Sequence, residues 1–170
     1  MTLRTWIAAV LLAASPLSLT ADTVEPTDLA PITHRSASLV VVGTDGFSQT
    51  YSPADLEGFP TYAMTTTTPW RETPARFEGV LLIDVLRAHG LDTVDSVTVM
   101  AENDFASEFS REVFSAYNIL IATRVDGQAH TRRERGPLQF VIHADDYTAD
   151  SPLRERHFVW MAARIEETTE

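Results

Sequence analysis

The sequence of 170 residues contains no cysteine. This absence excludes disulfide bonds, thiolate metal sites, iron–sulfur clusters and a cysteine nucleophile. Lysine is also absent, so all 13 basic residues are arginines, against 24 aspartates and glutamates and a formal net charge of -11. Contacts to nucleic acid phosphates require a net basic face. We therefore expect no nucleic acid partner.

Several recurrent catalytic motifs are missing as well. The chain has no glycine-rich phosphate loop, no G-x-S-x-G elbow and no H-E-x-x-H helix. The five histidines are scattered, and none pairs with another at the spacing of metal ligands: His34, His89, His130, His143 and His157. Asp145-Asp146 could hold a hard cation or form a polar turn. We therefore assign no metal ligand.

The N-terminus has the pattern of an export signal. Arg4 supplies a positive charge, and the apolar run from Trp6 to Ala14 is too short to cross a bilayer about 30 Å thick as a helix. Pro16 and the small residues that end at Ala21 are typical of a cleavage region. This predicts a signal peptide over residues 1–21 and a periplasmic or secreted mature protein without a membrane span. An uncleaved membrane anchor is the alternative.

The rest of the chain reads as one folded unit. Residues 22–36 contain prolines, threonines and acidic residues without periodicity, which predicts a flexible N-terminal arm. Residues 37–167 follow as a single domain of ordinary size, with the 44% hydrophobic content of a globular protein. No internal repeat is visible.

The first half of this domain is rich in strand signals. Residues 38–42 and 47–51 flank a glycine-containing turn and predict a hairpin. Ser52, Pro53 and Asp55 form a helix start for about one turn before Gly58. The threonine-rich segment 61–68 should be extended, and a polar loop should lead from Trp70 to residue 77.

The second half adds one clear helix and further strands. Leu82, Val85, Leu86 and His89 share one helical face, and Gly90 marks the end. Residues 97–101, 119–125, 138–142 and 159–165 have strand patterns, and residue 110 should cap a short turn. An Asp-Gly pair at 126–127 predicts a tight hairpin. The fold class is therefore α+β, mostly β, with short helices.

An arginine cluster is the main candidate for binding chemistry. Arg132, Arg133 and Arg135 lie within four residues of an otherwise acidic chain. A guanidinium group is a planar fork that matches two oxygens of an oxyanion. Pairing of the predicted strands would bring Arg71, Arg76 and Arg124 nearby. The alternative is that the cluster is a solvent-exposed hairpin connection, whose positive charge Glu134 partly neutralises.

Four segments together resemble a known family. They are ARFEGVLLIDVLRAHGL, SVTVMAENDF, ILIATRVDGQAHTRRERGPLQFVIHADD and FVWMAARIEE. In order and spacing they are similar to the molybdopterin-binding domains of sulfite-oxidase-type oxidoreductases, over roughly residues 59–167. The match looks closest to small exported proteins that consist of little more than this domain. The resemblance implies the fold of that family.

The resemblance also implies a cofactor site with one ligand missing. In the family's enzymes a cysteine thiolate binds molybdenum, and arginine and histidine side chains hold the pterin phosphate. Here the corresponding segment, MTTTTPW, offers Thr65 to Thr68 instead. A threonine hydroxyl is a poor ligand for a soft metal centre. The resemblance thus suggests molybdopterin as a cofactor, whereas the missing cysteine argues against it.

Three hypotheses follow. The first is an exported, non-enzymatic binding module for an anionic small molecule or a periplasmic partner protein. The second is a molybdopterin-dependent oxidoreductase with a cysteine-free metal site, and the third is a structural partner subunit that uses an apolar interface. Candidate binding residues for the first two are Trp70, Arg71, Arg76, Asp104, Arg132, Arg133 and Arg135. Trp70 and Trp160 could also form the wall of a pocket beside the arginine cluster; the alternative is that both belong to the core.

Overall fold

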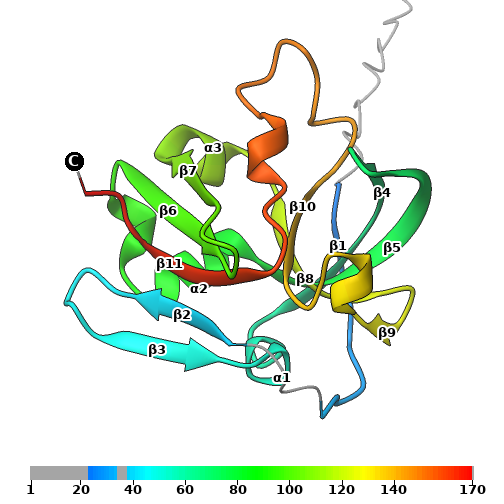
Figure 1. Ribbon diagram of the computed structural model, residues 1–170, viewed down its shortest axis with the longest axis horizontal. Helices are drawn as coiled ribbons and strands as arrows, with labels where there is room; N and C mark the ends of the chain where they lie inside the picture. Colours follow the sequence, from blue (N-terminus) through cyan, green and yellow to red (C-terminus); the bar gives the residue numbers. More distant parts are fainter. Residues whose placement is uncertain (1–22, 34–37, 170) are drawn as a thin grey trace, which may run out of the picture.

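The computed structural model describes residues 23–33 and 38–169. Two β-sheets dominate it and lie against one another, as Figure 1 shows. The first sheet has the strand order β1-β4-β5-β8-β10, with β9 added to β8, and the second has the order β3-β2-β11-β6-β7. Their pairings are antiparallel except for β11 on β2, which is parallel. The α+β, mostly β fold class is confirmed.

The elements of the first sheet are β1 (Glu25–Pro26), β4 (Thr61–Thr68), β5 (Arg71–Leu81), β8 (Ile119–Val125), β9 (Gln128–Ala129) and β10 (Gln139–Ile142). Those of the second are β2 (Leu39–Val42), β3 (Ser48–Tyr51), β6 (Ser96–Ala101), β7 (Ala106–Ser110) and β11 (Ala162–Glu167). The helices are α1 (Pro53–Leu56), α2 (Leu82–Ala88) and α3 (Arg111–Ala116). Three 3-10 turns complete the fold: η1 (Leu91–Thr93), η2 (Arg132–Glu134) and η3 (Glu155–His157). None of the helices in the described ranges has the length and apolarity needed to cross a bilayer.

The main core lies between the two sheets. Val41 of β2, Val99 of β6 and Phe140 of β10 are fully buried in one cluster that also contains the apolar face of α2. A second cluster covers the other face of the first sheet and includes Leu120 and Val141. The central strands of the first sheet are therefore buried on both faces, which holds the loops at their ends in place.

Several local predictions are confirmed. Ser52 and Asp55 form a capping box at the start of α1. Gly90 takes a left-handed conformation with φ of 69° after α2, and Ser110 caps α3. The turn at residues 126–127 has positive φ at both positions, 50° and 75°, as a type I′ hairpin requires.

The predicted polar loop from Trp70 to residue 77 is wrong. This segment is the first part of β5, an 11-residue strand that pairs with β4 from its start. A register shift between Thr66 and Thr68 accommodates the polar stretch around Pro74, and proline is tolerated at such irregularities. The stretch lacks apolar alternation because its outer residues are exposed.

Three further predictions at the sheets need correction. β7 was not predicted, because it is an edge strand with only Ser107 and Phe109 buried. β10 does not alternate, since all four of its residues are buried between the two clusters. The last strand begins at Ala162 instead of residue 159, because Met161 has a positive φ of 53° and a register shift follows it.

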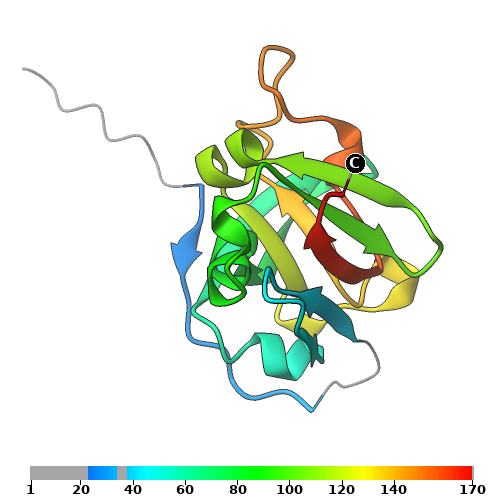
Figure 2. The ribbon, with the colours of Figure 1, turned by 90° about the vertical axis from the view of Figure 1, so that its left-hand side faces the viewer.

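The segment from residue 23 to residue 33 lies on the first sheet. β1 pairs with β4, and Val24 is buried against the second cluster. Farther along, the carbonyl oxygen of Ala30 accepts a hydrogen bond from Arg124. Figure 2 shows this segment at the outer edge of the molecule. The predicted signal peptide, residues 1–21, and residues 22 and 34–36 of the predicted arm lie outside the described residues.

Candidate functional site

A cavity lies between the β4–β5 hairpin and the connection from β9 to β10. Its volume is about 210 Å³. The lining residues are Thr68, Trp70, Arg71, Phe77, His130, Arg133, Glu134, Arg135 and Gln139. We refer to it as the arginine cavity. It joins segments that are about 60 residues apart in the sequence, so only the pairing of β5 with β8 brings them together.

The β4–β5 hairpin supplies one wall. Thr68 pairs with Arg71 at the end of the ladder, and Trp70 lies in the turn between them. Arg71 Nη2 lies 3.5 Å from Asp126 Oδ2, and the side chains of Arg71 and Asp126 are 38% and 56% exposed. An exposed pair at that distance contributes little, because water screens it. The positive charge of Arg71 is therefore only weakly compensated.

The opposite wall comes from η2 and the residues around it. Arg133 and Glu134 lie on η2, and Arg135 follows with a left-handed φ of 75°. Gly136 passes so close to His130 that a Cβ at this glycine would lie 2.6 Å from the backbone carbon of that histidine. Glycine is required here because any side chain would push the loop away from the cavity.

Trp70 connects the two walls. The guanidinium carbon of Arg135 lies 4.8 Å from the centroid of the Trp70 ring. A guanidinium within about 6 Å of an aromatic face is attracted by the ring's quadrupole. The contact orients Arg135 without neutralising its charge.

His130 forms the buried end of the cavity. It is 1% exposed, and its Nε2 lies 2.9 Å from Gln139 Oε1. Burial lowers the pKa of His130, while the hydrogen bond to Gln139 opposes this shift. Its Nδ1 and the Nε of Arg71 are buried without a hydrogen-bond partner among the described residues. Buried polar atoms without partners are uncommon, and sites that receive a ligand or water are one place where they occur.

The predicted site residues separate into two groups. Trp70, Arg71, Arg133 and Arg135 line the arginine cavity. Arg132 turns away and makes a bidentate ion pair with Glu102, one bond being 2.9 Å. These positions show that consecutive arginines in one run have different roles.

The two remaining predicted residues also lie elsewhere. Arg76 pairs with Glu25 and with Glu78, the latter at 3.2 Å from its Nε. Asp104 has a left-handed φ of 64° in the turn between β6 and β7, and it does not line the cavity. Arg124, which the sequence also placed nearby, is buried in an ion pair with Glu57.

The arginines of the cavity differ from most others in their electrostatic partners. Arg76, Arg87, Arg111, Arg124, Arg132 and Arg164 each form an ion pair of 3.3 Å or less with a carboxylate. The guanidinium groups of Arg133 and Arg135 make no hydrogen bond or ion pair with any described residue. Glu134 is the one carboxylate among the lining residues, which include three arginines. The cavity is thus locally positive in an acidic protein.

Five lining residues were not predicted as site residues from the sequence: Thr68, Phe77, His130, Glu134 and Gln139. Thr68 was considered only as a replacement for the missing cysteine, and Gln139 lies within a strand pattern. His130 was set aside as a lone histidine, although it immediately precedes the arginine cluster. Its proximity to that cluster is the signal that could have identified it.

The site does not fit a molybdenum cofactor. Thr66 Oγ1 already donates to the carbonyl of Thr67 and accepts from the backbone nitrogen of Ala144, at 2.9 Å. Of the four threonines, Thr68 alone lines the cavity, and it offers a hard hydroxyl where a soft thiolate is needed. The volume of 210 Å³ is below the range of about 300–1,000 Å³ for drug-sized ligands. Within the described part of the chain, no group of three histidine or acidic side chains could hold a metal ion.

A larger hollow, of about 560 Å³, lies along the β2–β3 hairpin. It is lined by exposed residues such as Asp45 and Phe47 and by His89, whose Nε2 lies 2.9 Å from the hydroxyl of Tyr51. Burial lowers the pKa of His89. No arginine lines this hollow, so it lacks the charge that distinguishes the arginine cavity.

Comparison with known proteins identifies the type of fold. No family model and no curated protein matches the sequence. Among solved structures, the chain is similar to the sulfane dehydrogenase SoxCD from Paracoccus pantotrophus, with a TM-score of 0.60 and 14% sequence identity. The match covers 79% of the present chain and 39% of the other, so the chain spans well under half of that protein's length. It confirms a sulfite-oxidase-type fold.

Proposed function

We propose that the mature chain is an exported binding module that holds a small oxyanion in the arginine cavity, without molybdenum redox chemistry. The observation that carries this proposal is the contrast among the arginines. Most are neutralised by carboxylates, whereas Arg133 and Arg135 face the cavity without such partners and Arg71 has only a distant one. The signal sequence predicted over residues 1–21 supports export.

The chemistry of the cavity favours a phosphate, sulfate or carboxylate group. Three guanidinium forks surround a space too small for most drug-sized molecules. Each fork can donate two parallel hydrogen bonds to a pair of oxygens, and charge-assisted bonds are about twice as strong as neutral ones. A carboxylate on a periplasmic partner protein would use the same donors.

Isothermal titration of the purified chain with inorganic phosphate and with sulfate tests this proposal. Arg133→Gln and Arg135→Gln should each weaken binding about tenfold or more, because a hydrogen bond to a charged group contributes about 1.5–3 kcal/mol. The matched control is the double variant Glu102→Gln with Arg132→Gln. It removes a neighbouring ion pair without changing the net charge, and it should bind like the unmodified chain. Equal binding by all variants would refute the proposal.

The alternative is a molybdopterin-dependent oxidoreductase of the sulfite oxidase type with a cysteine-free metal site. Its support is the fold, which is shared with SoxCD, while the donor set described above opposes it. Elemental and absorbance analysis of protein purified from a periplasm that makes molybdopterin separates the two. Stoichiometric molybdenum would overturn the binding-module proposal, and the next step would be to substitute Thr68.

A further inference from the structure

A second cavity adjoins the arginine cavity. Its volume is about 310 Å³, and its lining is Trp70, Asn103, Phe105, Glu155, Arg156, Phe158 and Trp160. Four of these seven residues are aromatic, and the polar ones come from the β6–β7 turn and η3. We refer to it as the aromatic cavity. Its lining is mostly aromatic, with Arg156 as the one arginine, whereas three arginines line its neighbour.

The two cavities share one wall, the side chain of Trp70. Arg135 stacks on this ring within the arginine cavity. A second link is the backbone bridge between Gln139, which lines the arginine cavity, and Trp160, which lines the aromatic cavity. A third is the hydrogen bond from the backbone nitrogen of Met161, next to Trp160, to the carbonyl of Arg135. The cavities therefore adjoin one another across Trp70.

The aromatic cavity is built by defined backbone conformations. Asp104, with its left-handed φ, forms the tight turn in which the nitrogen of Ala101 donates to the carbonyl of Phe105 at 2.8 Å. This turn presents Phe105, which is 43% exposed. Trp70 is 37% exposed, although a buried core would be the usual place for such rings. Exposed aromatic rings that line one hollow commonly mark a binding surface.

We infer that the ligand is an amphipathic anion, with its oxyanion in the arginine cavity and an aryl or comparable flat apolar group in the aromatic cavity. This inference rests on the proposed function, because the charged end of the ligand occupies the same guanidinium groups. Trp70 would contribute to binding both parts of the ligand, since it orients Arg135 in the arginine cavity and lines the aromatic cavity. Together the two cavities have the volume of an ordinary small-molecule site, which the arginine cavity alone does not reach.

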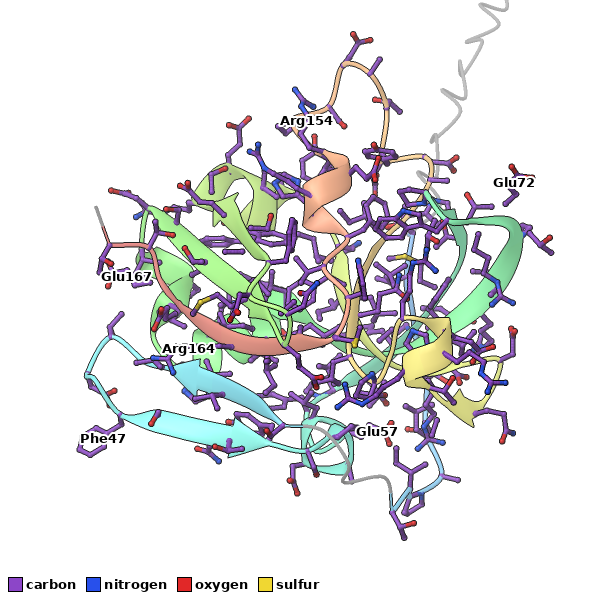
Figure 3. All side chains as sticks on the ribbon, in the orientation of Figure 1. Phe47, Glu57, Glu72, Arg154, Arg164 and Glu167 are labelled. Atoms are coloured by element: carbon purple, nitrogen blue, oxygen red, sulfur yellow. The ribbon has the colours of Figure 1, made fainter. Side chains whose placement is uncertain are left out.

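Calorimetric titration with three probes tests the inference: inorganic phosphate, phenyl phosphate and phenol. Phenyl phosphate should bind about 10- to 100-fold more tightly than inorganic phosphate, since burying a ring of this size adds roughly that factor. Phe105→Ala should remove most of this advantage while leaving the affinity for inorganic phosphate unchanged. The matched control is Phe47→Ala, at another exposed phenylalanine, which lies on the β2–β3 hairpin and points away from the body of the protein (Figure 3). This variant should retain the full advantage.

The outcomes separate the inference from the proposed function. Equal affinities for inorganic phosphate and phenyl phosphate, both reduced by Arg135→Gln, would overturn the inference and leave the oxyanion site standing. Binding of phenol as tight as that of phenyl phosphate, with no effect of Arg135→Gln, would overturn both. If neither inorganic phosphate nor phenyl phosphate binds, both the inference and the proposed function are overturned.

Discussion

The ion pair between Arg124 and Glu57 is predicted to be the most sensitive electrostatic contact in the domain. Both side chains are 7% exposed. Glu57 Oε1 accepts from Arg124 Nε at 2.9 Å and from Thr123 Oγ1 at 2.6 Å, and Glu57 Oε2 accepts from Arg124 Nη2 at 2.5 Å. Arg124 also donates to the carbonyl of Ala30. The pair therefore ties β8 to the end of α1, beside which Glu57 lies (Figure 3), and to the N-terminal segment.

Replacing Arg124 with methionine should lower the free energy of unfolding by about 3–5 kcal/mol. The reason is that Glu57 would stay buried without its counter-charge, and breaking one half of a buried pair has about this cost. For a domain of about this size, each kcal/mol shifts the melting temperature by about 2–4 °C. Urea denaturation followed by circular dichroism, together with a thermal scan, gives both quantities.

Two controls sharpen this measurement. The double variant Arg124→Met with Glu57→Met should recover much of the loss, because no uncompensated charge remains in the core. Arg87→Met removes an ion pair with Asp84 on α2 in which the arginine side chain is 61% exposed and the aspartate side chain 19% exposed. Because water reaches the arginine, this change should cost no more than about 1 kcal/mol. A loss below about 1 kcal/mol for Arg124→Met, similar to that of Arg87→Met, would refute the reasoning.

Two further predictions concern the backbone and pH. Gly79→Ala should lower the free energy of unfolding by about 3 kcal/mol, because its Cβ would lie 2.1 Å from the carbonyl oxygen of Ile121. Gly127→Ala should lower it by only about 1 kcal/mol, because of the positive φ at that position. Equal losses for the two variants in urea denaturation would contradict this prediction. Burial lowers the pKa of His130 from its ordinary value of 6.5, so the unfolded chain binds a proton that the folded chain resists. The free energy of unfolding should therefore fall as the pH drops below about 6.5, by at most about 1.4 kcal/mol per pH unit for each such histidine. His130→Gln should make the free energy of unfolding depend less steeply on pH. Part of the dependence should remain, because burial also lowers the pKa of His157. If His130→Gln leaves the pH dependence unchanged, His130 is not held in its neutral form by burial.

Elements that depend on neighbouring residues could be predicted from the sequence. The capping box of α1 needs only Ser52 and Asp55, and the hairpin after β8 needs only the Asp-Gly pair. In both cases the stabilising contacts form within about three residues, so local chemistry decides the structure. The resemblance to sulfite-oxidase-type domains likewise predicted the fold that the structural match confirms.

Elements that depend on residues distant in the sequence could not be predicted from the sequence. The first half of β5 has little apolar alternation, and it is a strand because β4 supplies its hydrogen bonds. β10 is buried on both faces because two separate clusters cover it, and a period of two cannot be seen in such a strand. The start of β11 depends on the irregular pairing at Met161.

The candidate site shows the same division. By itself the sequence determined that the chain has no thiolate ligand and that a cluster of arginines lies in an acidic protein. It did not determine which arginines remain available. Arg132 meets a glutamate 30 residues away, and Arg76 meets one 51 residues away, while Arg133 and Arg135 keep their charge uncompensated beside Trp70. Only the tertiary structure decides this, because charge compensation depends on distances in space, and the folded sheets set those distances.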